Sequence, residues 1–219
     1  EWLNELAKIT PKKGEEMFYS DPSLLDPSKR IINRIEYFAY RDDYIRNFVF
    51  GSKMKQLVDF VLDDESVLFK EKFNFKLPGG GGFKPHQDIQ PGWDDYAPYF
   101  VSVLVVIDDN LQENGCLELA KGHHKRGWIG RRFEPLEGTE LDGIDFEKYP
   151  MKAGDAVVFD CFVPHQSDPN LSDKPRRNLY LTFNRAGDGD HREKYFSDKR
   201  SNFPPDHERD PGKTYHFKV

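Results

Sequence analysis

The sequence predicts a mainly β fold that is braced by helices near its N-terminal end. Four runs rich in β-branched and aromatic residues lie in the middle and later parts of the chain, at the length of ordinary strands. An apolar stripe of helical period precedes them. A Pro-Gly cluster at residues 78–82 ends the first of these runs.

The first third of the chain is predicted to be mostly helical. One amphipathic helix has Ser52 as a candidate N-cap, and a shorter helix begins near Trp2. Residues 31–40 are ambiguous, and a strand is favoured there. The stripe of the longer helix consists of Met54, Leu57, Val58, Val61 and Leu62.

The four predicted strands cover residues 73–77, 99–107, 154–160 and 178–184. The second is strongly β-branched and too short to span a membrane, which is typical of a strand buried on both faces. The glycine run after the first strand is not followed by a helix, so a phosphate cradle is disfavoured. A mobile loop that leads to a polar site is the preferred interpretation.

His86 and Asp88 lie just after this loop, and His165 follows the third predicted strand. In an extended segment residues i and i+2 point to the same side, so both groups of a His-X-Asp triplet can contact one ion. Two imidazoles and a carboxylate on one face of a metal are typical of non-haem Fe(II). The triplet alone is also compatible with a solvated polar turn.

The order of the motifs resembles the phytanoyl-CoA dioxygenase family of Fe(II)- and 2-oxoglutarate-dependent oxygenases, which includes ectoine hydroxylase. The resemblance covers residues 72–185. It is carried by HQD at 86–88, NGCLELAKGHHKRG at 114–127, GDAVVF, PHQS, and an arginine eleven residues after the distal histidine.

This resemblance implies that His86, Asp88 and His165 hold Fe(II), with 2-oxoglutarate and O2 as cosubstrates. Arg176 would bind the distal carboxylate of 2-oxoglutarate through its planar guanidinium. Three further residues are candidate contacts of the same cosubstrate: Ser167, Asn74 and, more weakly, Lys76.

The resemblance also implies a double-stranded β-helix, a cupin-like jelly-roll with N-terminal helices packed on one sheet. The whole chain, 1–219, would form one oxygenase domain. Its parts would be a mostly helical support at 1–65, the jelly-roll core at 66–185 and a C-terminal tail at 186–219, which is polar and lacks strong periodicity.

Composition excludes several classes of protein. The chain has 38 acidic and 32 basic side chains in 219 residues, a net charge of −6, so no nucleic-acid surface is expected. No apolar run is long enough for a membrane span, and the two cysteines form neither a zinc spacing nor a disulfide framework. A cytoplasmic enzyme with a small-molecule substrate is expected, while its oligomeric state is left open.

The substrate is the least determined element. Trp93 and Tyr96, in an aromatic and acidic segment after Asp88, would suit a cationic amine, although an exposed loop has the same composition. Asn184 and Arg185 are candidates for an anionic group. The tail resembles that of aminoalkylphosphonate oxygenases, which suggests an amine- or phosphonate-bearing substrate.

Two other classes of function remain open. A non-catalytic binding module on the same fold is possible, because folds do not dictate function. A metal-dependent hydrolase would use the same three ligands around zinc. Neither alternative requires an arginine at position 176.

Overall fold

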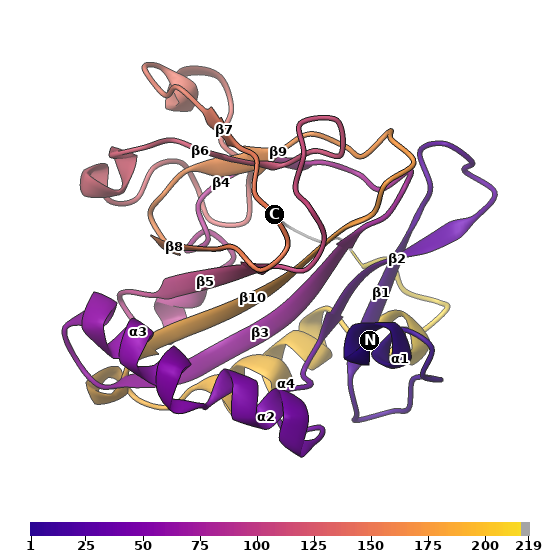
Figure 1. Ribbon diagram of the computed structural model, residues 1–219, viewed down its shortest axis with the longest axis horizontal. Coiled ribbons are helices and arrows are strands. Elements are labelled where there is room, and N and C mark those ends of the chain that lie inside the picture. Colours follow the sequence, from indigo (N-terminus) through magenta and orange to yellow (C-terminus); the bar gives the residue numbers. More distant parts are fainter. Residues whose placement is uncertain (216–219) are drawn as a thin grey trace.

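Two antiparallel β-sheets face each other in the computed structural model, which describes residues 1–215 (Figure 1). The larger sheet has the order β1 (Met17–Pro22), β2 (Arg30–Glu36), β3 (Ser66–Lys76), β10 (Arg176–Arg185), β5 (Val101–Val106) and β8 (Ala156–Asp160). The smaller sheet has the order β4 (Phe83–His86), β9 (His165–Ser167), β6 (Leu117–Leu119) and β7 (Glu147–Tyr149). This arrangement confirms the predicted jelly-roll, and each of the four predicted strands is present.

The long antiparallel pair of β3 and β10 forms the middle of the larger sheet. Alternation along β3 places Phe73 and Phe75 on the outer face, where they join the largest apolar cluster. Lys72 and Lys76 therefore point to the inner face, between the sheets. The polar side of this strand is turned toward the interior and not toward water.

The N-terminal helices α1 (Trp2–Leu6), α2 (Asp43–Val49) and α3 (Ser52–Leu62) cover the outer face, as predicted (Figure 1). Ser52 is not the N-cap of α3, because Gly51 holds that position without a side-chain cap. A Cβ atom at Gly51 would lie 2.2 Å from the carbonyl oxygen of Asn47, so the close approach of α2 and α3 requires glycine there. Across residues 1–215, none of the helices has the length and hydropathy needed to cross a bilayer.

Residues 1–65 are less helical than predicted, because β1 and β2 lie between the helices and extend the larger sheet. The strand favoured within 31–40 is β2. The tail, which was predicted only to be polar and without strong periodicity, contains the helix α4 (Arg192–Asn202). Residues 216–219 of the predicted tail lie outside the described part of the chain.

A buried ion pair attaches α4 to β3. The guanidinium of Arg192 donates to both carboxylate oxygens of Glu71, at 2.5 and 2.9 Å, and both side chains are almost fully buried. Glu71 also accepts hydrogen bonds from the backbone N–H groups of Phe38 and Ala39. This tertiary interaction explains a helix that the polar tail sequence did not reveal.

The glycine run is an anchored turn and not the mobile loop that was predicted. Gly79 donates to the carbonyl of Asn170 and accepts from the N–H of Leu24, each at 2.8 Å. A Cβ atom at Gly82 would lie 2.6 Å from the carbonyl oxygen of Ser167. Glycine here allows close packing of the chain against the end of β9.

We expect Arg192→Ala to lower the free energy of unfolding by about 3–5 kcal/mol, because it leaves the Glu71 carboxylate buried without its cation. Lys194→Ala on the same helix is the control. Its ion pair with Asp198 is exposed, so its loss should be under about 1 kcal/mol. Denaturant titration of both variants measures the difference, and equal losses would contradict this account of how α4 is held.

Candidate metal centre

His86 and His165 are brought together by the pairing of β4 with β9, in which they are direct register partners. Asp88 lies two residues beyond His86, in the turn that follows β4. One ligand atom from each of the three side chains lies within 4.8 Å of the others, and His165 Nε2 is 3.8 Å from Asp88 Oδ1. The structure thus assembles the three residues that the sequence proposed as metal ligands.

Backbone contacts orient both imidazoles for metal binding. The Nδ1 atom of His86 lies 2.7 Å from the carbonyl oxygen of Lys84, and that of His165 lies 3.0 Å from the carbonyl oxygen of Val163. Because a carbonyl oxygen only accepts, each Nδ1 carries the proton and each Nε2 keeps its lone pair. This is the tautomer that a metal ligand needs.

The protonation states also favour a cation. Burial and the neighbouring His165 lower the pKa of His86 to about 3, and burial lowers the pKa of His165. Burial alone would raise the pKa of Asp88, but His165 and Lys72 outweigh it and hold that pKa below its usual value. At neutral pH the site therefore offers two neutral imidazoles and one carboxylate, which fits Fe(II).

Buried polar side chains hold the Asp88 segment in place. Ser102 donates to Asp88 Oδ2 at 3.1 Å and contacts Thr182 of β10 at 3.0 Å. Gln87 is fully buried, and its Nε2 donates to the carbonyls of Phe162 and Gly127. Since Phe162 belongs to the loop that leads to His165, Gln87 connects the two segments that carry the ligands.

A second polar cluster lies at the paired ends of β3 and β10, where Lys76 and Arg176 are register partners. They are 2% and 1% exposed, and within residues 1–215 neither has a carboxylate within ion-pair distance. Lys76 Nζ donates to Ser167 Oγ at 2.6 Å, and Arg176 Nε donates to Asn110 at 2.5 Å. Burial, together with Arg176, lowers the pKa of Lys76 to about 6.

This cluster contains all four predicted cosubstrate contacts. Asn74 faces the same inner side as Lys76, is 5% exposed, and its Oδ1 has no hydrogen-bond partner among the described residues. A Cβ atom at Gly115 would lie 2.1 Å from the carbonyl oxygen of Asp168 and 3.1 Å from Lys76 Nζ, so only glycine fits beside this lysine. Arg176 is a buried cation, and Lys76, whose lowered pKa leaves it largely neutral near pH 7, would regain its proton beside a bound carboxylate, so the pair forms a site for a carboxylate ligand.

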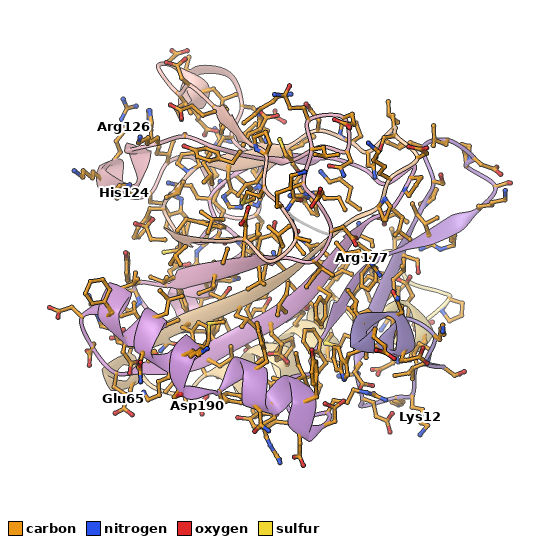
Figure 2. The ribbon with its side chains drawn as sticks, viewed as in Figure 1. Lys12, Glu65, His124, Arg126, Arg177 and Asp190 are labelled. Atoms are coloured by element: carbon orange, nitrogen blue, oxygen red, sulfur yellow. The ribbon has the colours of Figure 1, made fainter. Side chains whose placement is uncertain are left out.

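Arg177 has a different environment from its neighbour Arg176. Its guanidinium forms a two-pronged ion pair with Asp108, at 2.7 and 2.8 Å, and its side chain is partly exposed. The basic turn that contains His124 and Arg126 lies at the periphery of the molecule in Figure 2.

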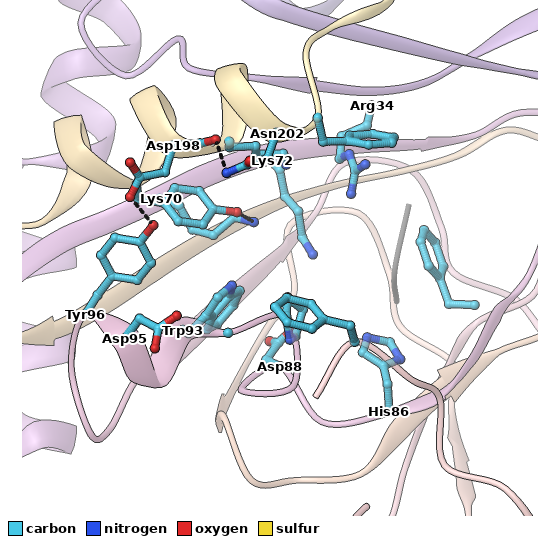
Figure 3. A pocket seen from close by; sticks show the side chains of 17 residues that line it. Arg34, Lys70, Lys72, His86, Asp88, Trp93, Asp95, Tyr96, Asp198 and Asn202 are labelled. Carbon is cyan, nitrogen blue, oxygen red and sulfur yellow. Dashed lines mark hydrogen bonds between the residues drawn. The ribbon is translucent and has the colours of Figure 1, made fainter. Parts of the chain in front are cut away.

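A cavity of about 460 Å³ opens beside His86 and Asp88 (Figure 3). Trp93 and Tyr96 line it, as the sequence predicted for substrate contacts. The Tyr96 hydroxyl donates to Asp198 of α4 at 2.7 Å. The volume is within the range of small-molecule sites, about 300–1,000 Å³.

The predicted substrate contacts Asn184 and Arg185 do not line this cavity. The Asn184 amide donates to the backbone carbonyls of Arg185 and Gly189, and Arg185 Nε donates to the carbonyl of Leu62. Both lie beyond the irregularity after Thr182, at the end of β10 opposite to Arg176. Their position after the last strand did not indicate which end of the sheet holds the site.

Sequence reasoning missed the cations of the cavity, which are Arg34, Lys70, Lys72 and Lys199. They come from β2, β3 and α4, which are far apart in sequence. The alternation of Lys70, Lys72 and Lys76 with phenylalanines was a usable signal, but such alternation ordinarily indicates a strand with its polar face in water.

Comparison with known proteins gives consistent results. The profile of the phytanoyl-CoA dioxygenase (PhyH) family matches residues 4–178. A 2-aminoethylphosphonate dioxygenase from the uncultured bacterium HF130_AEPn_1 is 36% identical over 217 residues, 98% of this chain and 82% of that protein. The methylphosphonate hydroxylase of Gimesia maris is 34% identical over 206 residues, 93% of this chain and 76% of that protein.

Among solved structures, EctD from S. alaskensis with 2-oxoglutarate and 5-hydroxyectoine has the same fold. It superposes with a TM-score of 0.66 at 22% identity, and the match covers 74% of this chain and 59% of the EctD chain.

Asp88→Ala and His165→Ala should each abolish stoichiometric Fe(II) binding, because each variant removes one of three ligands. Ser102→Ala should weaken binding by about 10-fold, since it removes only the hydrogen bond that orients Asp88. Anaerobic titration calorimetry with Fe(II) measures these effects, and His124→Ala at the periphery is the control. Retention of one equivalent of iron by Asp88→Ala would refute the ligand assignment.

Proposed function

This chain belongs to the phytanoyl-CoA dioxygenase family, and from that premise we propose that it is an Fe(II)- and 2-oxoglutarate-dependent dioxygenase that hydroxylates a small phosphonate-bearing molecule. The main support for this proposal is the buried triad of His86, Asp88 and His165, which lies beside a cavity of small-molecule size. The two curated relatives, named as enzymes of 2-aminoethylphosphonate and methylphosphonate, support the substrate class.

The triad would hold Fe(II) by one face. When bound, the metal together with 2-oxoglutarate and O2 supplies the oxidising chemistry, with release of succinate and CO2. The protein provides the ligand geometry, the charge balance and a partly enclosed cavity. Ser102 and Gln87 keep the Asp88 segment in place, so the carboxylate does not need to reorganise when the metal binds.

We assign the cosubstrate site to the buried cluster of Lys76, Arg176 and Ser167. The distal carboxylate of 2-oxoglutarate would take the place of the missing counter-ion. Asn110 accepts from Nε of Arg176 and so fixes the plane of the guanidinium that would bind the carboxylate. Asn74, with its unpartnered Oδ1, lies on the same inner face.

The aromatic part of the cavity would contact the remainder of the substrate. Trp93 is 2% exposed and packs edge-to-face against Phe69 and Phe100, so its ring is a rigid wall. Tyr96 and Asp198 form the adjoining rim. An amine group could lie against this wall, where an aromatic face and carboxylates both favour a cation.

The two alternative functions each leave a feature unexplained. A hydrolase has no use for the buried pair of Lys76 and Arg176 beside the metal centre. A binding module without catalysis has no use for three preoriented metal ligands.

One experiment separates the three functions. Anaerobic addition of 2-oxoglutarate to the Fe(II)-loaded protein should produce a weak visible charge-transfer band, and O2 should then yield succinate. A panel of small phosphonates, amines and acyl-CoA compounds should contain phosphonates that increase the rate of succinate release. Absence of both the band and succinate would eliminate the oxygenase.

Arg176→Met should increase the KM for 2-oxoglutarate by about 10- to 100-fold, because it removes a charge-assisted pair of hydrogen bonds. Arg177→Met is the matched control, since that side chain binds Asp108 and not the cluster. Steady-state rates of succinate formation at a series of 2-oxoglutarate concentrations give the KM of both variants. The same KM in wild type and Arg176→Met would show that the cosubstrate carboxylate binds elsewhere.

A further inference from the structure

We infer that Lys72, flanked by Arg34 and Lys199, forms the subsite that binds the dianionic phosphonate head of the substrate. This inference rests on the proposed function and adds the residues that recognise the head group. The three side chains come from β3, β2 and α4 and line the cavity beside the metal ligands His86 and Asp88.

Lys72 is the central element of this subsite. Its side chain extends into the cavity from the larger sheet, toward the side that carries Asp88 and His86 (Figure 3). Within residues 1–215 its ammonium group makes no hydrogen bond and no ion pair, and it lies 4.8 Å from the centroid of the Tyr180 ring. Burial lowers the pKa of Lys72 to about 8, and the nearby carboxylate of Asp88 offsets only part of this effect.

Arg34 and Lys199 lie on either side of one buried carboxylate. Glu36, which is 0% exposed, forms ion pairs with both, and Arg34 Nε is 3.1 Å from its Oε1. A single carboxylate therefore holds both basic side chains at the cavity wall. Lys70 adds a further ammonium group, which donates to the Tyr195 hydroxyl at 2.8 Å.

Within residues 1–215, the acidic residues that line the cavity are engaged elsewhere and form no ion pair with Lys72. Asp88 belongs to the metal centre, and Asp95 pairs with Arg132 at 2.7 Å. Asp198 pairs with Lys194 at 2.5 Å. A ligand with two negative charges and three oxygen acceptors suits such a wall better than a monoanion does.

Strand β3 would thus serve two anions at once. Lys76, at its end, lies beside Arg176 for the carboxylate of the cosubstrate, and Lys72, four residues earlier on the same face, points into the cavity. Phe83 lies beside both positions, since it lines the cavity and its ring centroid lies 5.5 Å from Lys76 Nζ. The two anions would therefore have separate cationic partners.

The test compares Lys72→Met with Lys53→Met, which removes an exposed lysine from α3. Loaded with Fe(II) and 2-oxoglutarate without O2, wild type and Lys53→Met should melt at a higher temperature when 2-aminoethylphosphonate is added. Lys72→Met should lose this shift while keeping the charge-transfer band and melting no lower than wild type without phosphonate. Lys72→Arg should restore part of the shift because it restores the charge.

Taurine, which carries a tetrahedral sulfonate with one negative charge, tests the preference for a dianion. Wild type should respond to taurine far less than to 2-aminoethylphosphonate, and Lys72→Met should reduce the ratio of the two apparent affinities by at least about 10-fold. An unchanged phosphonate shift and ratio in Lys72→Met would overturn the inference and leave the oxygenase assignment intact. A wild-type protein that forms the band but responds to no phosphonate would overturn both the inference and the substrate class, whereas absence of the band would refute the oxygenase itself.

Discussion

The antiparallel pairing of β3 with β10 is the constraint on which the rest of the structure depends. Its register places Arg176 opposite Lys76 and sets which side chains of both strands enter the space between the sheets. Through Thr182 it reaches Ser102 and so the carboxylate of Asp88. A shift of β3 by one residue would exchange its inner and outer faces, remove Phe73 from the apolar cluster and turn Lys72 and Lys76 to the outside.

This arrangement places several cations in a poorly solvated interior, which is unfavourable for folding. The lowered pKa values of Lys76 and Lys72 both have burial as their main cause. Two features offset this cost of burying charge. One is the apolar outer face, and the other is a pair of buried carboxylates, Glu36 and Glu71, which each bind more than one partner. Functional sites often lower the stability of the fold in this way. Here the bound ligands would supply part of the missing negative charge.

Much of the fold and the metal centre could be predicted from the sequence, because strands of β-branched residues and a His-X-Asp triplet are local patterns. Prediction of the triad also required the long-range pairing of β4 with β9, which the order of the motifs implied. The helix α4 could not be predicted, since it has no long apolar stripe and is held by the buried ion pair of Arg192 with Glu71 and by two buried rings, Tyr195 and Phe196. Asn184 was misplaced because the sequence does not show which end of a strand meets the site.

The helix α4 forms one wall of the cavity. Polar contacts also connect it to the other walls. Lys199 joins it to Glu36 on β2, and Tyr96 reaches Asp198 from the opposite rim. Because ligands stabilise whichever state binds them, occupancy of the cavity and docking of this helix are thermodynamically linked. The C-terminal segment therefore acts as a reporter of occupancy, and its backbone amides should exchange hydrogen more slowly as the cavity fills.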